Sequence, residues 1–227
     1  YVQKNVDLMA GILGKYQTLI NVPIVFTTAI GTMILPAIAR SVVNRDKIAI
    51  RDKTRLALKL GFVITIPSAM GLTVLSDSIY RTLYGINTPG HLLMTYGAFI
   101  TVLIGMIQIQ TTVLQSLNRF YACLWTLVIG LAVKIGINYM LIGIPSINIY
   151  GAIIGGYVGY GITFILNVIL LKKSIKKNIG YSSMLMGPIA ASLLMGVVIF
   201  YVNKFGLYIF RGIPASSKTY GLITFMA

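Results

Sequence analysis

The sequence predicts an all-α fold, a polytopic bundle of transmembrane helices, from its composition, its mean hydropathy and the recurrence of its apolar runs. Hydrophobic residues make up 57% of the chain, charged residues only 10%, and the mean hydropathy is +0.86. Soluble domains carry about 25% charged residues. The apolar runs approach the roughly 20 residues that a helix needs to cross about 30 Å of hydrocarbon. The chain therefore has too few charged residues to cover the surface of a soluble protein, whereas a membrane bundle needs no such surface.

Six apolar stretches are long enough to span a bilayer, and we treat residues 1–227 as one transmembrane bundle. In chain order, the expected spans are 16–39, 56–76, 92–117, 121–143, 150–171 and 184–202. Residues 1–14 are expected to be the tail of a preceding helix, and residues 219–227 the start of a truncated seventh span. The chain lacks an initiator methionine and a signal peptide, so we expect a fragment of a longer protein.

The basic residues are concentrated in alternate connectors, which predicts the orientation. Twelve lysines and arginines lie in or beside residues 40–55, 118–119 and 172–178, and four lie in the other connectors. Because cytoplasmic loops are enriched in Lys and Arg, we expect these three loops to be cytoplasmic in a multi-pass plasma membrane protein. Loop 40–55 serves either as a topology determinant that contacts lipid headgroups or as a recruiter of an anionic substrate headgroup. The net charge of +15 then requires no nucleic acid partner.

Lys134 is the most informative single residue, because it lies well inside the span 121–143. A charge at such depth costs roughly 2.5–3.5 kcal/mol. Asn138 lies one turn further on the same helix face, and none of the six spans contains Asp or Glu. Three interpretations remain open: Lys134 faces a polar cavity that binds an anion, pairs with a carboxylate elsewhere in the full protein, or snorkels to the interface.

A polar stripe follows one face of the span 92–117. It comprises Gln108, Thr111, Thr112, Gln115 and Arg119. Such a stripe is costly against lipid, so it should face protein or water. Hydrogen bonding between helices and a sugar-binding surface explain it equally well. The candidate substrate-binding residues are therefore Lys134, Asn138, Gln108, Thr111, Gln115 and Arg119.

The sequence offers little for catalysis or metal binding. It contains one histidine, one cysteine and four acidic residues, and it has no phosphate-binding glycine loop. We expect no catalytic residue, no cofactor, no metal site and no enzymatic activity. Gly151, Gly155 and Gly159 recur at four-residue spacing, which favours close packing against a neighbouring helix.

The order of several short motifs resembles the stage V sporulation protein B and polysaccharide exporter family, within the multidrug/oligosaccharidyl-lipid/polysaccharide flippase superfamily. The matching segments, in order, are Leu13-Gly14-Lys15-Tyr16, Asn21-Val22-Pro23, Ile34-Leu35-Pro36-Ala37-Ile38, Ile66-Pro67-Ser68-Ala69-Met70-Gly71-Leu72, Leu83-Tyr84-Gly85, Leu114-Gln115-Ser116-Leu117-Asn118-Arg119, Val133-Lys134, and Ile149-Tyr150-Gly151-Ala152. Thr18 departs from the lipid II flippase branch, which tends to carry arginine five residues before the proline that matches Pro23.

The resemblance implies the C-terminal lobe of a fourteen-helix, MATE-like transporter, in which the span 16–39 is the eighth helix. It further implies alternating access by a flippase for undecaprenyl-linked saccharides, namely peptidoglycan precursors or polysaccharide repeat units of a cell wall or spore envelope. Lys134 matches a position where the family typically has lysine, which implies a place near the substrate pyrophosphate. The implied partners are the lipid-linked saccharide, membrane lipids and an N-terminal half of the same chain.

Two other functions stay open on the sequence alone. A drug or cation antiporter of the same superfamily usually places a carboxylate in its cavity, and the six spans have none. A non-transporting membrane scaffold for envelope or spore assembly has no need for unpaired polarity such as Lys134 within a span.

Overall fold

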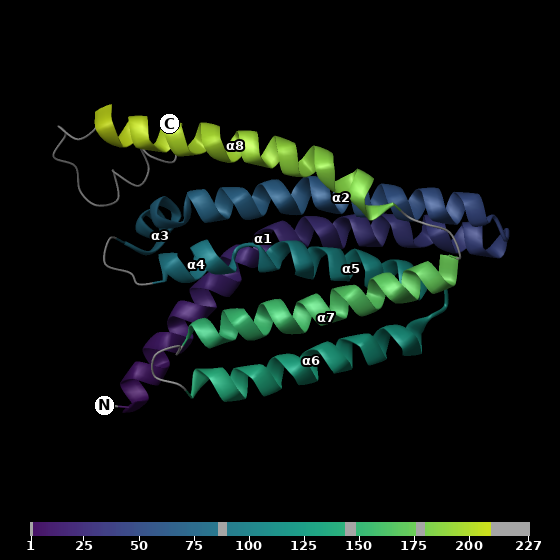
Figure 1. The fold of residues 1–227 in the computed structure, drawn as a ribbon, viewed down its shortest axis with the longest axis horizontal. Coiled ribbons are helices and arrows are strands. Elements are labelled where there is room, and N and C mark those ends of the chain that lie inside the picture. Colours follow the sequence, from purple (N-terminus) through teal and green to yellow (C-terminus); the bar gives the residue numbers. More distant parts are fainter. Residues whose placement is uncertain (1, 86–89, 144–148, 176–179, 210–227) are drawn as a thin grey trace.

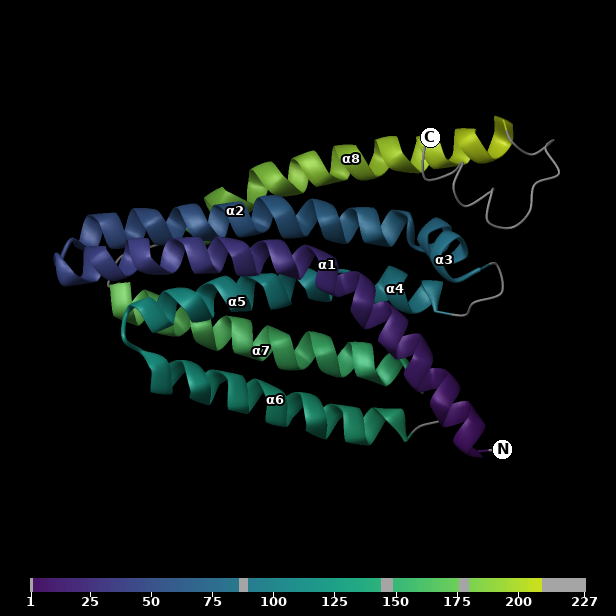
Figure 2. The ribbon, with the colours of Figure 1, turned by 180° about the vertical axis from the view of Figure 1, so that it is seen from behind.

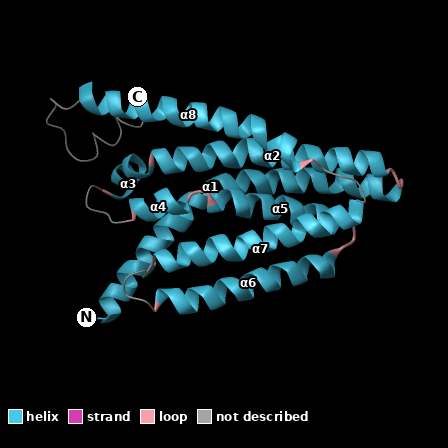
Figure 3. Cartoon of the chain, viewed as in Figure 1, coloured by secondary structure: helices cyan, strands magenta, loops and turns pink. Residues whose placement is uncertain are grey.

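The computed structural model describes residues 2–85, 90–143, 149–175 and 180–209, and every regular element within these ranges is a helix (Figure 3). The helices are α1 (Val2–Val43), α2 (Lys47–Val74), α3 (Ser76–Tyr84), α4 (His91–Gly97), α5 (Ile100–Ser116), α6 (Phe120–Ile142), α7 (Tyr150–Ile175) and α8 (Tyr181–Ile209). The predicted polytopic helical bundle is confirmed.

The long helices lie side by side (Figure 1). Helix α8 packs on α2, α2 packs on α1 and α5, α5 packs on α7, and α7 packs on α6. Helices α6 and α8 therefore form opposite edges of the bundle. Their outward side chains are large and apolar, for example Trp125 and Leu194, as expected for surfaces in contact with lipid. Seen from behind, the N-terminal part of α1 leaves the bundle direction and crosses toward the ends of α7 and α6 (Figure 2).

Each of the six predicted spans overlaps one or two of these helices. Within the described ranges, five helices are long and apolar enough to cross a membrane, and α4 with α5 makes a sixth, broken span. The stretch predicted as one span at 92–117 is divided between α4 and α5, which meet at 48° around Ala98 and Phe99. The expected span at 219–227 lies outside the described residues.

The helix that contains the first predicted span begins earlier than the sequence predicts. Residues 1–14 were expected to belong to a preceding helix, but α1 is continuous from Val2 to Val43. Gly14 and Lys15 do not interrupt it, and the Lys15 ammonium lies 4.9 Å from the centre of the Tyr84 ring. At about 1.5 Å per residue such a helix is about 63 Å long, roughly twice the hydrocarbon thickness, so part of α1 extends beyond the core.

The basic connector 40–55 is mostly helical, in contrast to the expected loop. Only the turn from Asn44 to Asp46 separates α1 from α2. The Asp46 carboxylate caps α2 by accepting hydrogen bonds from the amides of Ile48 and Ala49, at 3.0 and 2.9 Å. Lys53 of α2 donates hydrogen bonds to the Ala37 carbonyl and the Ser41 hydroxyl, which joins α2 to the C-terminal part of α1. Hydrogen bonds therefore fix both the start of α2 and its contact with α1.

At the break between α4 and α5, two tyrosine hydroxyls from other helices donate hydrogen bonds to backbone carbonyls. Tyr16 of α1 donates to the Gly97 carbonyl at 2.8 Å, and Tyr157 of α7 donates to the Tyr96 carbonyl at 2.7 Å. A side chain at Gly97 would collide with the Tyr16 ring. Carbonyls freed by a helix break must find partners inside a membrane. These two hydroxyls therefore stabilise the bent conformation and attach α1 and α7 to it.

Replacing Tyr16 by phenylalanine is expected to destabilise the protein by about 1–3 kcal/mol, because the Gly97 carbonyl would lose its partner in a buried position. Tyr16 is only 6% exposed. Thermal unfolding of the full-length protein in detergent measures the effect. Tyr157→Phe is the matched control: its hydrogen bond is exposed, so a smaller loss is expected. Equal losses of stability in the two variants would mean that burial does not determine the contribution of these hydrogen bonds.

Candidate functional site

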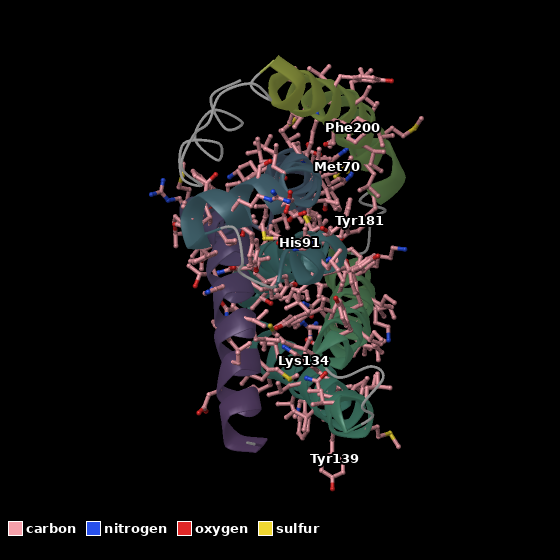
Figure 4. The ribbon with its side chains drawn as sticks, turned by 90° about the vertical axis from the view of Figure 1, so that its left-hand side faces the viewer. Met70, His91, Lys134, Tyr139, Tyr181 and Phe200 are labelled. Carbon is pink, nitrogen blue, oxygen red and sulfur yellow. The ribbon has the colours of Figure 1, made fainter. Side chains whose placement is uncertain are left out.

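Lys134 lies inside the bundle, on the face of α6 that is turned toward α7. Its ammonium donates a hydrogen bond to the Tyr160 hydroxyl at 2.8 Å and lies 4.4 Å from the centre of the Tyr160 ring. Figure 4 shows Lys134 between α1 and the α6–α7 pair, whereas Tyr139 on the same helix points away from the bundle. The lysine is thus held within the bundle. Because an ammonium has three donors, two remain for another ligand.

Lys134 lines a cavity of about 300 Å³ between α1, α5, α6 and α7. Its polar lining comprises Lys134 and Asn138 from α6, Gln17 and Asn21 from α1, and the hydroxyl-bearing Tyr16 and Tyr160. The apolar part of the wall includes Ile100 and Ile104 of α5. Among the described residues that line it there is one cation and no carboxylate. Such a cavity favours an anionic group that also accepts hydrogen bonds from amides.

Asn138 lies beside Lys134 in this cavity and touches the glycine strip of α7. Its Oδ1 atom is buried and has no hydrogen-bond partner within the protein. A side chain at Gly155 would collide with that atom. The absence of a side chain at Gly155 therefore makes room for the Asn138 amide in the contact between α6 and α7.

The glycine strip predicted to pack closely does so, against α6. A Cβ atom at Gly159 would lie 2.6 Å from the Lys134 Cβ and 2.8 Å from the Gly130 carbonyl oxygen. One at Gly151 would lie 2.9 Å from the Leu141 Cβ. Next to this seam, Thr126 donates to the buried Asn167 amide oxygen at 2.7 Å. The backbone approach of α6 to α7 thus sets the position of Lys134.

The structure does not bring the polar stripe of α5 into the cavity. Gln108 donates to the Thr28 hydroxyl of α1 at 2.8 Å, so it connects two helices. Thr111 lies on a different side of α5, close to Cys123 of α6. Gln115 is half-buried and Arg119 is exposed, and neither lines the cavity of Lys134. Of the six candidate residues, only Lys134 and Asn138 share one site.

Several lining residues were not predicted from the sequence. Tyr16, Gln17 and Asn21 come from α1, and Tyr160 comes from α7. Gln17 and Asn21 are spaced by four residues, which places them on one helix face. That spacing could have indicated that both amides face the same cavity. Nothing in the sequence distinguishes Tyr160 from the other tyrosines, since its role depends on the register between α6 and α7.

Most of the chain matches one known protein family. The family model described as lipid II flippase MurJ matches residues 17–213. The chain is 24% identical over 181 residues to the lipid II flippase MurJ of Bacillus subtilis (strain 168), covering 78% of this chain and 32% of that protein. It is 25% identical over 160 residues to the stage V sporulation protein B of the same organism, covering 70% of this chain and 31% of that protein.

The chain spans about a third of the length of the curated relatives it matches, at 32% and 31%. No solved structure gives a significant match. The family match covers most of the chain, including most of the residues that line the cavity around Lys134. The chain therefore belongs to the lipid II flippase MurJ family.

Proposed function

We propose that the full protein moves undecaprenyl-linked saccharides across the plasma membrane by alternating access, and that this chain supplies its C-terminal lobe. The cargo class includes peptidoglycan precursors and polysaccharide repeat units. The observation that carries the proposal is the cavity that Lys134 shares with amide side chains and, among the described lining residues, with no carboxylate. A phosphate-linked sugar combines negative charge with hydroxyl groups, which is the chemistry that these side chains recognise.

In this proposal Lys134 contacts the phosphate groups of the cargo, and Asn138 contacts a hydroxyl or amide nearby. The ammonium has donors beyond the one given to Tyr160, so an arriving anion need not break that contact. Transport requires no covalent step, because the cargo is moved and not altered. The N-terminal half would close the cavity from the side of α1 and complete the alternating-access path.

The proposed orientation places the basic end of the bundle in the cytoplasm. The α1–α2 turn, the α5–α6 turn and the C-terminal end of α7 lie at the same end of the bundle, on the right in Figure 1. Bases gather at this end, including Arg45, Lys47, Arg119 and Lys172. A shared end is what the positive-inside rule requires if these connectors are cytoplasmic.

The test uses cells depleted of their own lipid-linked saccharide flippase. The full-length gene is expected to restore outward exposure of a labelled lipid-linked precursor, and cells with an empty vector give the baseline. Membrane levels of the protein are measured in parallel. Normal levels without restoration for several lipid-linked glycans would refute the proposal. Drug efflux measured in the same cells then separates an antiporter from a scaffold.

A further inference from the structure

The backbone at the break between α4 and α5 does not use the hydrogen bonds of a continuous helix. In an unbroken α-helix the Thr101 amide would pair with the Gly97 carbonyl, four residues earlier. Here that amide donates to the Ala98 carbonyl at 3.1 Å. The Gly97 carbonyl instead accepts the Tyr16 hydroxyl at 2.8 Å. One carbonyl therefore has two alternative donors, and the Tyr16 hydroxyl holds it in the bent conformation.

The side chain of Thr101 indicates what the second conformation would be. It is fully buried, and its hydroxyl has no hydrogen-bond partner within the protein. Other buried threonines of the bundle, for example Thr65 and Thr163, donate to the carbonyl four residues earlier. For Thr101 that carbonyl belongs to Gly97 and is bonded to Tyr16. If the break straightened, both the amide and the hydroxyl of Thr101 could bond to the Gly97 carbonyl.

The break lies at one end of the Lys134 cavity. Tyr16 and Ile100 both line that cavity, and Ile100 is the first residue of α5. Leu93 and Met94 of α4 are buried in the apolar cluster that also contains Tyr16 and Ile100. A ligand in the cavity would therefore lie against the side chain that holds the break and against the cluster on which α4 packs.

We propose that Tyr16 couples the occupancy of the Lys134 cavity to the angle between α4 and α5. A charged acceptor forms a stronger hydrogen bond than a neutral carbonyl, so a phosphate in the cavity competes with Gly97 for the Tyr16 hydroxyl. When the hydroxyl turns to the phosphate, Thr101 bonds to the Gly97 carbonyl and α4 aligns with α5. Because the proposed function places the cargo phosphate beside Lys134, this coupling rests on that function. The cargo thus shifts a two-state element by its differential affinity for the two states.

Distance measurements between spin labels test the coupling in the full-length protein. The labels are attached through Leu92→Cys on α4 and Ile165→Cys on α7, in a cysteine-free background; the native side chains are 46% and 57% exposed. The probe is undecaprenyl pyrophosphate in phosphatidylcholine nanodiscs. We expect it to produce a second distance, shifted by up to about 7 Å, because Leu92 lies about 9 Å along the helix from a break of 48°. Unchanged distances with the probe bound would overturn the proposal.

Tyr16→Phe separates the coupling from the proposed function. Loss of the hydroxyl weakens the bent conformation, so this variant should show the second distance without any probe. That result in a protein that binds no probe would refute the phosphate site, and the coupling with it, but support the two-state break. If the protein exports the labelled precursor while neither the probe nor the variant changes the distance, the flippase function stands and the coupling is wrong.

Thr101→Val gives an independent measurement. Valine removes only the hydroxyl that would bond to Gly97 in the straight conformation, so we expect a several-fold smaller population at the second distance with the probe. Thermal stability without the probe should be unchanged or raised, because a buried hydroxyl without a partner is lost. Thr65→Val is the matched control: it removes a hydroxyl already bonded to the Gly61 carbonyl at 2.8 Å, so stability should fall and the probe response should not. Equal probe responses in the two variants would contradict the role of Thr101 in the second conformation.

Discussion

Replacing Gly159 by alanine is expected to lower the free energy of unfolding by roughly 1–3 kcal/mol, the usual cost of adding bulk to a closely packed contact. The added Cβ atom would lie 2.6 Å from the Lys134 Cβ and 2.8 Å from the Gly130 carbonyl oxygen. Neither neighbour is the flexible end of a side chain, so the two helices must separate. Thermal unfolding of the full-length protein in detergent provides the measurement.

Gly161→Ala on the same helix is the matched control. A Cβ atom at Gly161 meets no other atom within 4 Å. Alanine is favoured over glycine in a helix by about 1 kcal/mol, so this variant should be as stable as wild type or slightly more stable. If both alanine variants lose stability equally, the loss is a general effect of replacing glycine in α7 and the close contact is unimportant. Because Gly159 touches Lys134, the first variant should also impair transport.

Local patterns in the sequence indicate where the long apolar helices lie and which two residues of α6 share the candidate site. Hydropathy located the apolar runs, and the i to i+4 spacing of Lys134 and Asn138 placed both on one face of α6. The four-residue glycine spacing predicted the contact between α7 and another helix. Each of these features depends on a single helix, whose geometry is known before its neighbours are.

Features that depend on contacts between helices could not be predicted. The bend between α4 and α5 is stabilised by Tyr16 and Tyr157, whose hydroxyls come from helices far away in the sequence. The polar stripe of α5 looked like one surface, yet Gln108 bonds to α1 while Thr111 is near α6. The stripe is wide enough to contact two helices at once.

Replacing Lys134 by methionine is expected to reduce transport strongly without reducing stability. Methionine keeps an unbranched side chain that is one atom shorter and removes the charge, so the hydrogen bond to Tyr160 is lost as well. A hydrogen bond to a charged group is worth about 1.5–3 kcal/mol, which corresponds to roughly 10- to 150-fold in transport if the cargo phosphate uses it. Removing an intramembrane charge also relieves roughly 2.5–3.5 kcal/mol of burial cost, so thermal stability should be unchanged or raised.

The opposite signs of the two effects distinguish the possible roles of Lys134. A lysine that only joins α6 to α7 through Tyr160 would lower stability and transport together when replaced. Tyr160→Phe serves as the control, because it removes the hydroxyl but keeps the ring that lies 4.4 Å from the ammonium. We expect that variant to retain most of its transport. A methionine variant that is stable and transports at the wild-type rate would place Lys134 outside the transport path. A variant that is stable and inactive would mean that the buried charge of Lys134 serves to bind the cargo and does not stabilise the fold.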